Sequence, residues 1–178
     1  MKTCGIRTIP FYDDSYPFRI KEKTKNHPPI LFTKGNYRLL NQACCAVVGA
    51  RKSSPRSLQF TKTITEKLVE KNKVIISGFA QGVDQQTLKT ALQLGGKSII
   101  VLPQGILHFL KEIEVDSDYI IKGQLLVVSS FFPEAQWQSR YAIMRNHHIY
   151  NMSDAIYIAE SGFKGGTFSG ARYGLSHG

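Results

Sequence analysis

Three glycine-rich stretches of this chain carry hydroxyl and cationic side chains in a pattern that suits phosphate binding. They are GARKSS at 49–54, SGFAQGVD at 77–84 and ESGFKGGTFSGAR at 160–172, and each follows a short apolar run. Glycine-rich turns that lead into helices present backbone N–H groups and the positive end of a helix dipole, and both attract phosphate. One such stretch is weak support, because glycine is also common in ordinary turns. Three of them with cations among them predict a site for a phosphorylated ligand.

The first of these stretches argues against a dinucleotide cofactor. AVVGARKSS has one glycine where the dinucleotide-binding fingerprint GxGxxG has three. GGKS at 95–98 resembles the end of a Walker loop, but the required leading glycine falls at Ala91. This motif also precedes an apolar run instead of following one. We therefore expect no bound cofactor.

Few residues are candidates for catalysis or for metal binding. Asp84 and Glu160 could act as an acid–base pair, although carboxylates at such positions more often cap helices or clamp glycine loops. His147 and His148 are adjacent and lack the spacing of metal ligands. The serines have no nucleophile-elbow context. The sequence therefore predicts a binding protein without a metal, not an enzyme.

The segment RYAIMRNHH at 140–148 adds further polar candidates. Arg145 and Asn146 could lie on the exposed face of an amphipathic helix, or they could contact phosphate and base edges, as Arg and Asn commonly do. Trp137 and Phe163 could stack on bases or be buried, and burial is the expectation for Trp137.

Five continuous apolar runs must position these loops. The runs are 44–49, 73–78, 98–102, 125–130 and 155–159, and helices are expected at about 55–71, 83–94 and 138–150 and from about 167 onward. Apolar runs that alternate with helices predict a parallel sheet covered on both faces. The predicted fold class is therefore α/β, an extended Rossmann-like, doubly wound, mostly parallel sheet with helices on both faces. Such sheets bind ligands at the carboxyl ends of their strands, where the three loops lie.

The first 40 residues have a different composition. Four prolines between residues 10 and 29 exclude a long helix, and a short strand is expected at 30–32. We predict an irregular N-terminal leader, 1–40, that packs on a Rossmann-like domain, 41–178, which carries the phosphate-binding loops. A further strand is expected after the last helix, so the domain could be truncated before it.

Length, charge and cysteine content narrow the class of protein. A chain of 178 residues that is 42% hydrophobic suits one domain with a real core. The net charge of +10 comes entirely from residues 1–75, which hold 15 Lys and Arg against 5 Asp and Glu. This asymmetry favours a polyanionic partner, although cations such as Lys62 and Lys67 could lie on a solvated helix face. The absence of a long apolar run and of a signal peptide, with two adjacent cysteines, fits a reduced cytoplasmic protein without a membrane partner.

Taken in order, these motifs resemble the DprA/Smf family of DNA-processing proteins. The resemblance rests on PPILFTKGN at 28–36, AVVGARKSS at 46–54, VIISGFAQGVD at 74–84, MRN at 144–146 and KGGTFSGAR at 164–172. Members have an extended Rossmann core that binds single-stranded DNA, usually as a homodimer. The resemblance implies a non-catalytic cytoplasmic protein of natural transformation and homologous recombination, which protects incoming strands or hands them to a RecA-type recombinase.

The loops and the resemblance together give a set of candidate contacts with the DNA backbone and with one exposed base. They are Gly49, Arg51, Lys52, Ser54, Ser77, Gly78, Gly82, Asp84, Arg145, Asn146, Lys164, Gly166, Thr167 and Arg172. The sequence departs from the family pattern at Gly165 and Gly170, where hydroxyls are usual, and at Ala142, where an aromatic residue is expected. The alternative is a Rossmann pocket for a nucleotide or nucleotide derivative, acting as a sensor or as a small-molecule hydrolase with Asp84 or Glu160 as the active carboxylate.

Overall fold

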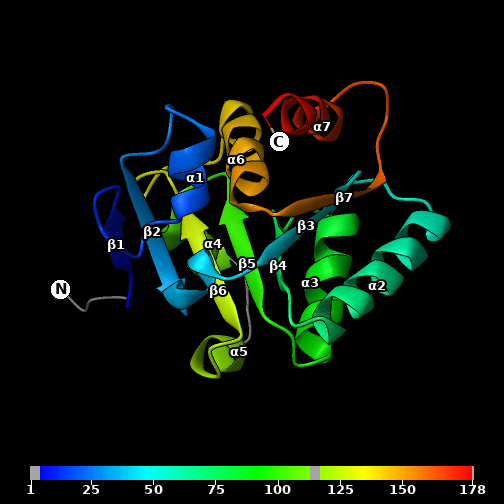
Figure 1. Ribbon diagram of the computed structural model, residues 1–178, viewed down its shortest axis with the longest axis horizontal. Coiled ribbons are helices and arrows are strands. Elements are labelled where there is room, and N and C mark those ends of the chain that lie inside the picture. Colours follow the sequence, from blue (N-terminus) through cyan, green and yellow to red (C-terminus); the bar gives the residue numbers. More distant parts are fainter. Residues whose placement is uncertain (1–4, 113–116, 178) are drawn as a thin grey trace.

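A computed structural model describes residues 5–112 and 117–177, and at its centre lies a mixed sheet of seven strands (Figure 1). The strand order is β1-β2-β6-β5-β4-β3-β7. The strands are β1 (Arg7–Pro10), β2 (Ile30–Gly35), β3 (Cys44–Gly49), β4 (Val74–Ser77), β5 (Ser98–Leu102), β6 (Leu125–Ser129) and β7 (Ala155–Glu160). Strands β3 to β7 pair in parallel with one another, whereas β2 joins β6, and β1 joins β2, in antiparallel pairs. The predicted α/β class with a mostly parallel sheet is confirmed.

Helices cover both faces of the sheet, as predicted. They are α1 (Phe18–Lys23), α2 (Pro55–Glu70), α3 (Val83–Gln93), α4 (Ile106–Glu112), α5 (Ser117–Ile121), α6 (Ser139–Met152) and α7 (Gly166–His177), with a 3-10 turn η1 (Tyr37–Asn41). Helices α1, α6 and α7 lie on one face, and α2 and α3 lie on the other (Figure 1). Side chains of each strand alternate between the two cores: Ile76 shares a core with Ile149 of α6, and Ile75 shares one with Leu68 of α2. Along the residues that the structure describes, no helix is long and apolar enough to cross a membrane.

Helix α2 begins where the sequence predicts, and its buried face consists mainly of small polar side chains. The Ser54 side chain caps the helix by accepting a hydrogen bond from the Ser57 N–H, and Pro55 occupies the first turn. Phe60 of this helix is half exposed, whereas Ser57, Thr61 and Thr65 are buried together with Leu68. Small side chains permit close helix packing, and the Thr61 hydroxyl donates to the Ser57 carbonyl at 2.8 Å, so its polarity is satisfied within the helix.

The first 40 residues are not irregular, and that part of the prediction is corrected. They contain β1, α1 and β2, and the two strands extend the sheet beyond β6. Pro10 is compatible with β1 because this strand lies at the edge of the sheet, where no second neighbour needs its N–H. The division into a leader and a domain at residue 40 remains a prediction.

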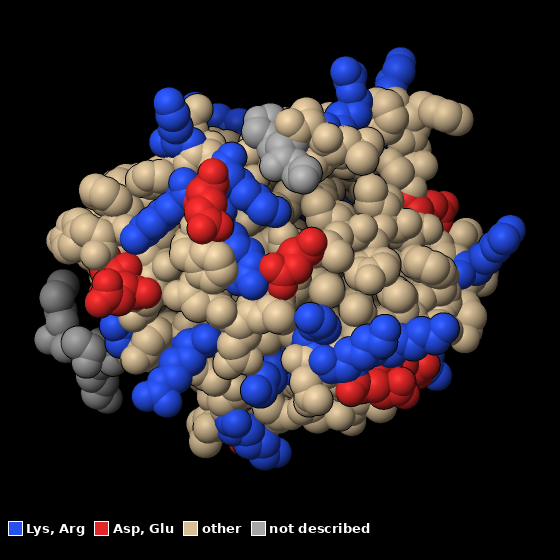
Figure 2. Space-filling model, viewed as in Figure 1, with Lys and Arg blue, Asp and Glu red and all other residues tan. Residues whose placement is uncertain are grey.

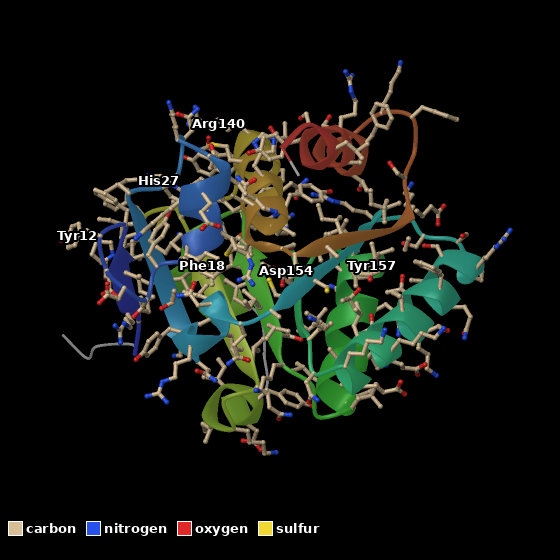
Figure 3. The ribbon with its side chains drawn as sticks, viewed as in Figure 1. Tyr12, Phe18, His27, Arg140, Asp154 and Tyr157 are labelled. Atoms are coloured by element: carbon tan, nitrogen blue, oxygen red, sulfur yellow. The ribbon has the colours of Figure 1, made fainter. Side chains whose placement is uncertain are left out.

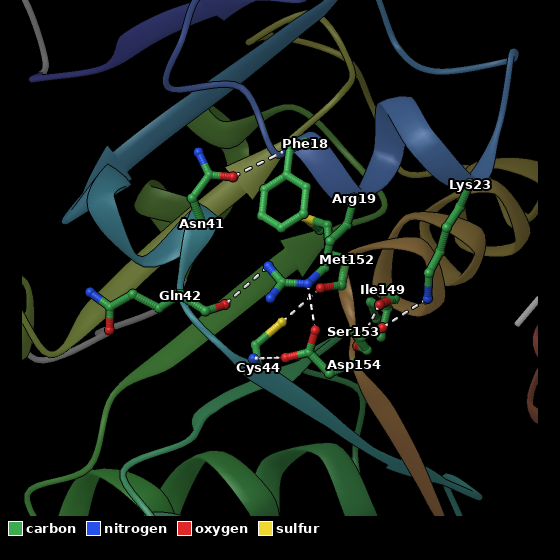
Figure 4. A network of polar contacts seen from close by, with 10 residues as sticks. All are labelled: Phe18, Arg19, Lys23, Asn41, Gln42, Cys44, Ile149, Met152, Ser153 and Asp154. Carbon is green, nitrogen blue, oxygen red and sulfur yellow. Dashed lines mark hydrogen bonds and ion pairs between the residues drawn. The ribbon is translucent and has the colours of Figure 1, made fainter.

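A network of polar contacts fastens α1 to the core (Figure 4). Arg19 forms an ion pair with Asp154 at 2.5 Å, and the second carboxylate oxygen of Asp154 accepts a hydrogen bond from the Cys44 N–H at 2.8 Å. Lys23 donates to the Ser153 carbonyl at 3.0 Å. Burial raises the pKa of the Cys44 thiol to about 12, so it stays protonated, and it donates to the Met152 carbonyl. Cys44 and Cys45 are buried and unpaired, as the sequence suggested.

Candidate nucleic-acid interface

A cavity of about 500 Å³ lies at the carboxyl ends of β3 and β7, the edge of the sheet where the sequence places the site. We call it the main cavity. Its walls come from the loop after β3, the loop after β7 and most of the length of α6, together with Ala80 and Asp84 after β4. Eight of the predicted contacts line it: Gly49, Arg51, Asp84, Arg145, Asn146, Lys164, Gly166 and Thr167. Residues far apart in sequence are thus brought together as expected.

A second cavity of about 230 Å³ adjoins the main cavity at the carboxyl ends of β4 and β5. Gly78 lines it, and Arg51, Ala80, Trp137 and Arg145 line both cavities. The two cavities therefore adjoin at these four residues, two of which are arginines, and we call the two cavities together the groove.

Arg145 is buried beneath the groove instead of lying on the surface of α6. Its side chain is only 4% exposed, and its Nη1 lies 3.9 Å from Asp84 Oδ2 and donates to the Val101 carbonyl at 3.4 Å. Its Nε has no hydrogen-bond partner among the described residues. Gly78 makes room for it, because a Cβ built on Gly78 would overlap Nη1. The guanidinium is thus held in place with donor capacity left unused at the junction of the two cavities.

Asp84 fixes both this arginine and the loop after β4. Its carboxylate accepts hydrogen bonds from the N–H groups of Gly78 and Ala80, each at 3.2 Å. Burial raises the pKa of the Asp84 carboxyl, and the neighbouring Arg145 charge opposes that shift. Burial likewise lowers the pKa of Arg145, opposed by Asp84. The side chain of Asp84 therefore has a structural role: it holds the loop after β4 and Arg145 in place.

Glu160, the other candidate carboxylate, is also occupied. It accepts hydrogen bonds from the Ser54 N–H at 2.8 Å and from the Ser54 hydroxyl at 2.9 Å. These hydrogen bonds from Ser54 lower the pKa of Glu160. Ser54 and Glu160 line a separate cavity beside Phe60, not the main cavity. Both carboxylates thus have the helix-capping or loop-clamping role that the sequence left open.

The loop after β7 is positioned by two contacts with its neighbours. The Thr167 hydroxyl donates to the Gly49 carbonyl at 3.1 Å, and Asn146 Nδ2 donates to the Gly166 carbonyl at 3.3 Å. These hydrogen bonds tie the first turn of α7 to the end of β3 and to α6. Lys164 is exposed on this loop and lines the main cavity.

Five predicted residues do not line the groove. Lys52 is exposed on the same loop as Arg51, and Ser54 caps α2. Ser77 is buried, and its hydroxyl donates to the Val47 carbonyl. Gly82 has φ +80°, and a Cβ built on it would lie 2.6 Å from the Arg51 carbonyl oxygen, so this position needs a glycine. Arg172 lines a further cavity beside α7 with Phe163 and Tyr173, and Lys164 lines both that cavity and the main cavity.

The most important residue that sequence reasoning misjudged is Trp137. We expected it to be buried, yet it is 49% exposed and lines both cavities. The available signal was its position just before the helix that carries Arg145, in a segment of polar residues. Cys, His, Asp and Glu form no cluster of three that could hold a metal ion among the described residues.

On the face drawn in Figure 2, the positive charge is not gathered into a single patch. Figure 2 shows Lys and Arg side chains in several separated places on one face, with Asp and Glu between them. Two leader cations, Arg19 and Lys23, are engaged with the core. Part of the excess charge of the first 75 residues therefore stabilises the fold, whereas Arg51, from the same part of the chain, lies at the site. Arg51 and Lys164 are the exposed cations that line the main cavity.

A family model described as DNA recombination-mediator protein A matches residues 7–178, nearly the whole chain. The chain belongs to this family. DNA processing protein DprA of Bacillus subtilis, a curated relative in the family, is 29% identical over 98% of this chain and 59% of its own length. The chain thus spans about three-fifths of that relative.

Two solved structures of family proteins are similar over 97% of this chain. DprA from Streptococcus pneumoniae superposes with a TM-score of 0.84 at 28% identity, over 60% of that protein. DNA processing protein A from Helicobacter pylori superposes with a TM-score of 0.78 at 25% identity, over 77% of that protein, and its structure concerns the single-stranded DNA binding mode of the Helicobacter protein. The extended Rossmann-like fold is therefore that of the family.

Proposed function

We propose that this chain binds single-stranded DNA in the groove formed by the main and second cavities. The observation that carries the proposal is the placement of Arg51 and Lys164, which are exposed cations from two different loops that line one cavity. Exposed Lys and Arg side chains bind the phosphate backbone of nucleic acids without regard to sequence. The Helicobacter relative is described as binding single-stranded DNA, which supports the same ligand class here.

The groove offers two further kinds of contact with a strand. The glycine-rich loops present backbone at the rim, and the helix α7 begins at Gly166 on the wall of the main cavity, so that its N-terminus favours phosphate. Arg145 lines both cavities, so its buried positive charge favours a phosphate group at the place where they adjoin.

A hydrolase is less well supported. It would need an active carboxylate in the groove, but Asp84 is bound to Arg145 and two backbone N–H groups, and Glu160 is bound to Ser54 outside the groove. We therefore propose a non-catalytic protein. The family is described as a recombination mediator, which supports a role in homologous recombination. We further propose that the chain acts in the cytoplasm during transformation, as a homodimer, and that it protects incoming DNA or hands it to a RecA-type recombinase.

The test is the affinity of the protein for a fluorescently labelled 20-mer of thymidylate, measured by anisotropy. Arg51→Ala and Lys164→Ala should each weaken binding by roughly 5- to 20-fold, as expected for a lost charged contact. Both should weaken binding to other sequences equally, because phosphate contacts carry no sequence information. Lys67→Ala is the matched control: this cation lies in the last turn of α2, opposite the end that Ser54 caps, and its loss should change nothing.

Two results would overturn the proposal. One is wild-type affinity in both groove variants. The other is thermal protection of the protein by mononucleotides equal to that by the 20-mer, which would favour the alternative of a nucleotide pocket.

A further inference from the structure

The second cavity has the composition of a site for a flat aromatic ring. Phe79, Phe109 and Trp137 line it, together with Leu102 and Pro103. Phe79 and Phe109 meet edge to face, with ring centroids 5.2 Å apart. At about 230 Å³ the cavity is smaller than the roughly 300–1,000 Å³ that drug-sized ligands occupy. It therefore suits a single ring system, not a whole nucleotide.

The backbone holds one of these aromatic walls in an unusual conformation. Phe79 has φ +62°, which is uncommon for a residue with a side chain. Such residues are concentrated at ligand clamps and active sites. Here the conformation lies directly between Gly78, which accommodates Arg145, and Ala80, whose N–H holds Asp84. The loop that fixes the arginine thus also fixes an aromatic wall of the cavity.

Polar groups lie where a base attached to a strand would need them. Gln81 and Gln104 line the cavity, and side-chain amides can pair with base edges. Arg51 and Arg145 line both cavities and therefore lie where the two adjoin. A phosphate in the main cavity could therefore be held while its base turned into the second.

Trp137 stands at this junction. It is half exposed and lines both cavities, whereas Ala142, which also lines the main cavity, has only a methyl group. A half-exposed indole beside cations suits the stacking of an unpaired base.

We propose that the second cavity receives one nucleobase of the bound strand, and that Trp137 stacks on that base. This inference rests on the proposed function, because the base belongs to the strand held in the main cavity. Stacking tolerates any base, since every base has a π face. The cavity therefore adds affinity for unpaired DNA with little preference for sequence.

Trp137 is the one tryptophan of the chain, so its intrinsic fluorescence reports on this site alone. The probes are a thymidylate 20-mer and an abasic 20-mer with the same number of phosphates. The thymidylate strand should quench Trp137 emission, with a midpoint equal to that of anisotropy. The abasic strand should bind more weakly and leave the emission unchanged.

Variants separate stacking from charge. Trp137→Ala should weaken binding about 5- to 100-fold without changing the salt dependence, and Trp137→Phe should restore most of the affinity. Tyr12→Ala is the matched control, because Tyr12 is 76% exposed and follows β1 at the opposite edge of the sheet from β7 (Figure 3). Its removal should leave binding unchanged. Urea unfolding of each variant shows whether it is folded.

The outcomes distinguish this inference from the proposed function. Binding of the thymidylate strand with unchanged Trp137 emission, and with wild-type affinity for folded Trp137→Ala, would overturn the base pocket and leave DNA binding in place. Failure of the wild-type protein to bind any oligonucleotide would overturn both.

Discussion

Replacing Gly78 by alanine should disrupt the buried ion pair at the centre of the groove. A Cβ at this position would overlap Arg145 Nη1 and lie 2.9 Å from Nη2. The φ angle of Gly78 is not positive, so an alanine would meet no backbone strain there. The whole effect must therefore come from displacement of the guanidinium.

The magnitude follows from what the displaced guanidinium leaves behind. Breaking a buried ion pair by removing one partner costs about 3–5 kcal/mol. Asp84 would keep its two backbone hydrogen bonds, and Arg145 could move into the open groove, so we expect a somewhat smaller loss, about 2–4 kcal/mol. DNA affinity should fall as well, because Arg145 leaves the junction of the cavities.

Urea unfolding measures this loss, with Gly162→Ala as a control of the same chemistry in the same cavity. A Cβ on Gly162 would meet only the Lys164 carbonyl oxygen, at 3.6 Å, which is an ordinary contact. In an Arg145→Ala background, Gly78→Ala should cost less than about 0.5 kcal/mol, because the group it displaces is already gone. An equal loss in both backgrounds, or a Gly78→Ala protein as stable as wild type, would refute the reasoning.

Two further predictions concern stability away from the groove. Burial lowers the pKa of His148 from 6.5 to about 4. Between these two pH values the unfolded chain binds a proton that the folded protein does not bind. The free energy of unfolding therefore falls as the pH falls through this range. Between pH 7 and pH 5, the free energy of unfolding of His148→Leu, measured by urea titration, should therefore fall by about 2 kcal/mol less than that of the wild type. An equal fall in both proteins would show that His148 is not the cause of the pH dependence. Asp154→Asn should lower the free energy of unfolding by about 1–2 kcal/mol, because it removes the ion pair that fastens Arg19. Glu22→Gln, on the exposed side of α1, should leave the free energy of unfolding unchanged. Equal stability of the two variants would count against the role of this network.

The elements around the site could be predicted because each is encoded locally. Strands β3 to β7 are continuous apolar runs, and the sequence places each within one or two residues of its observed bounds. The start of α2 follows from Ser54 and Pro55. Strand β1 escaped prediction because RTIP has no clear pattern, and it becomes a strand only by pairing with β2.

Side-chain directions depended on contacts between distant segments, and there the sequence was insufficient. Arg145 resembles a surface residue of an amphipathic helix until Gly78 and Asp84, from another loop, provide a place for it. Arg172 lies five residues after Thr167 on α7, which turns it roughly 140° around the helix axis and away from the main cavity. Neither fact can be read from a motif alone.

The salt dependence of DNA binding tests the central claim most directly. Affinity for a thymidylate 20-mer and for a 20-base-pair duplex should be measured by anisotropy between 50 and 200 mM salt. With two to four groove cations on phosphates, a slope of about −0.7 per contact predicts a roughly 7- to 50-fold loss of single-strand affinity over this range. The single strand should also bind more tightly than the duplex at every salt concentration, because only an unpaired base can enter the second cavity. Binding that does not change with salt, or that favours the duplex, would contradict the account.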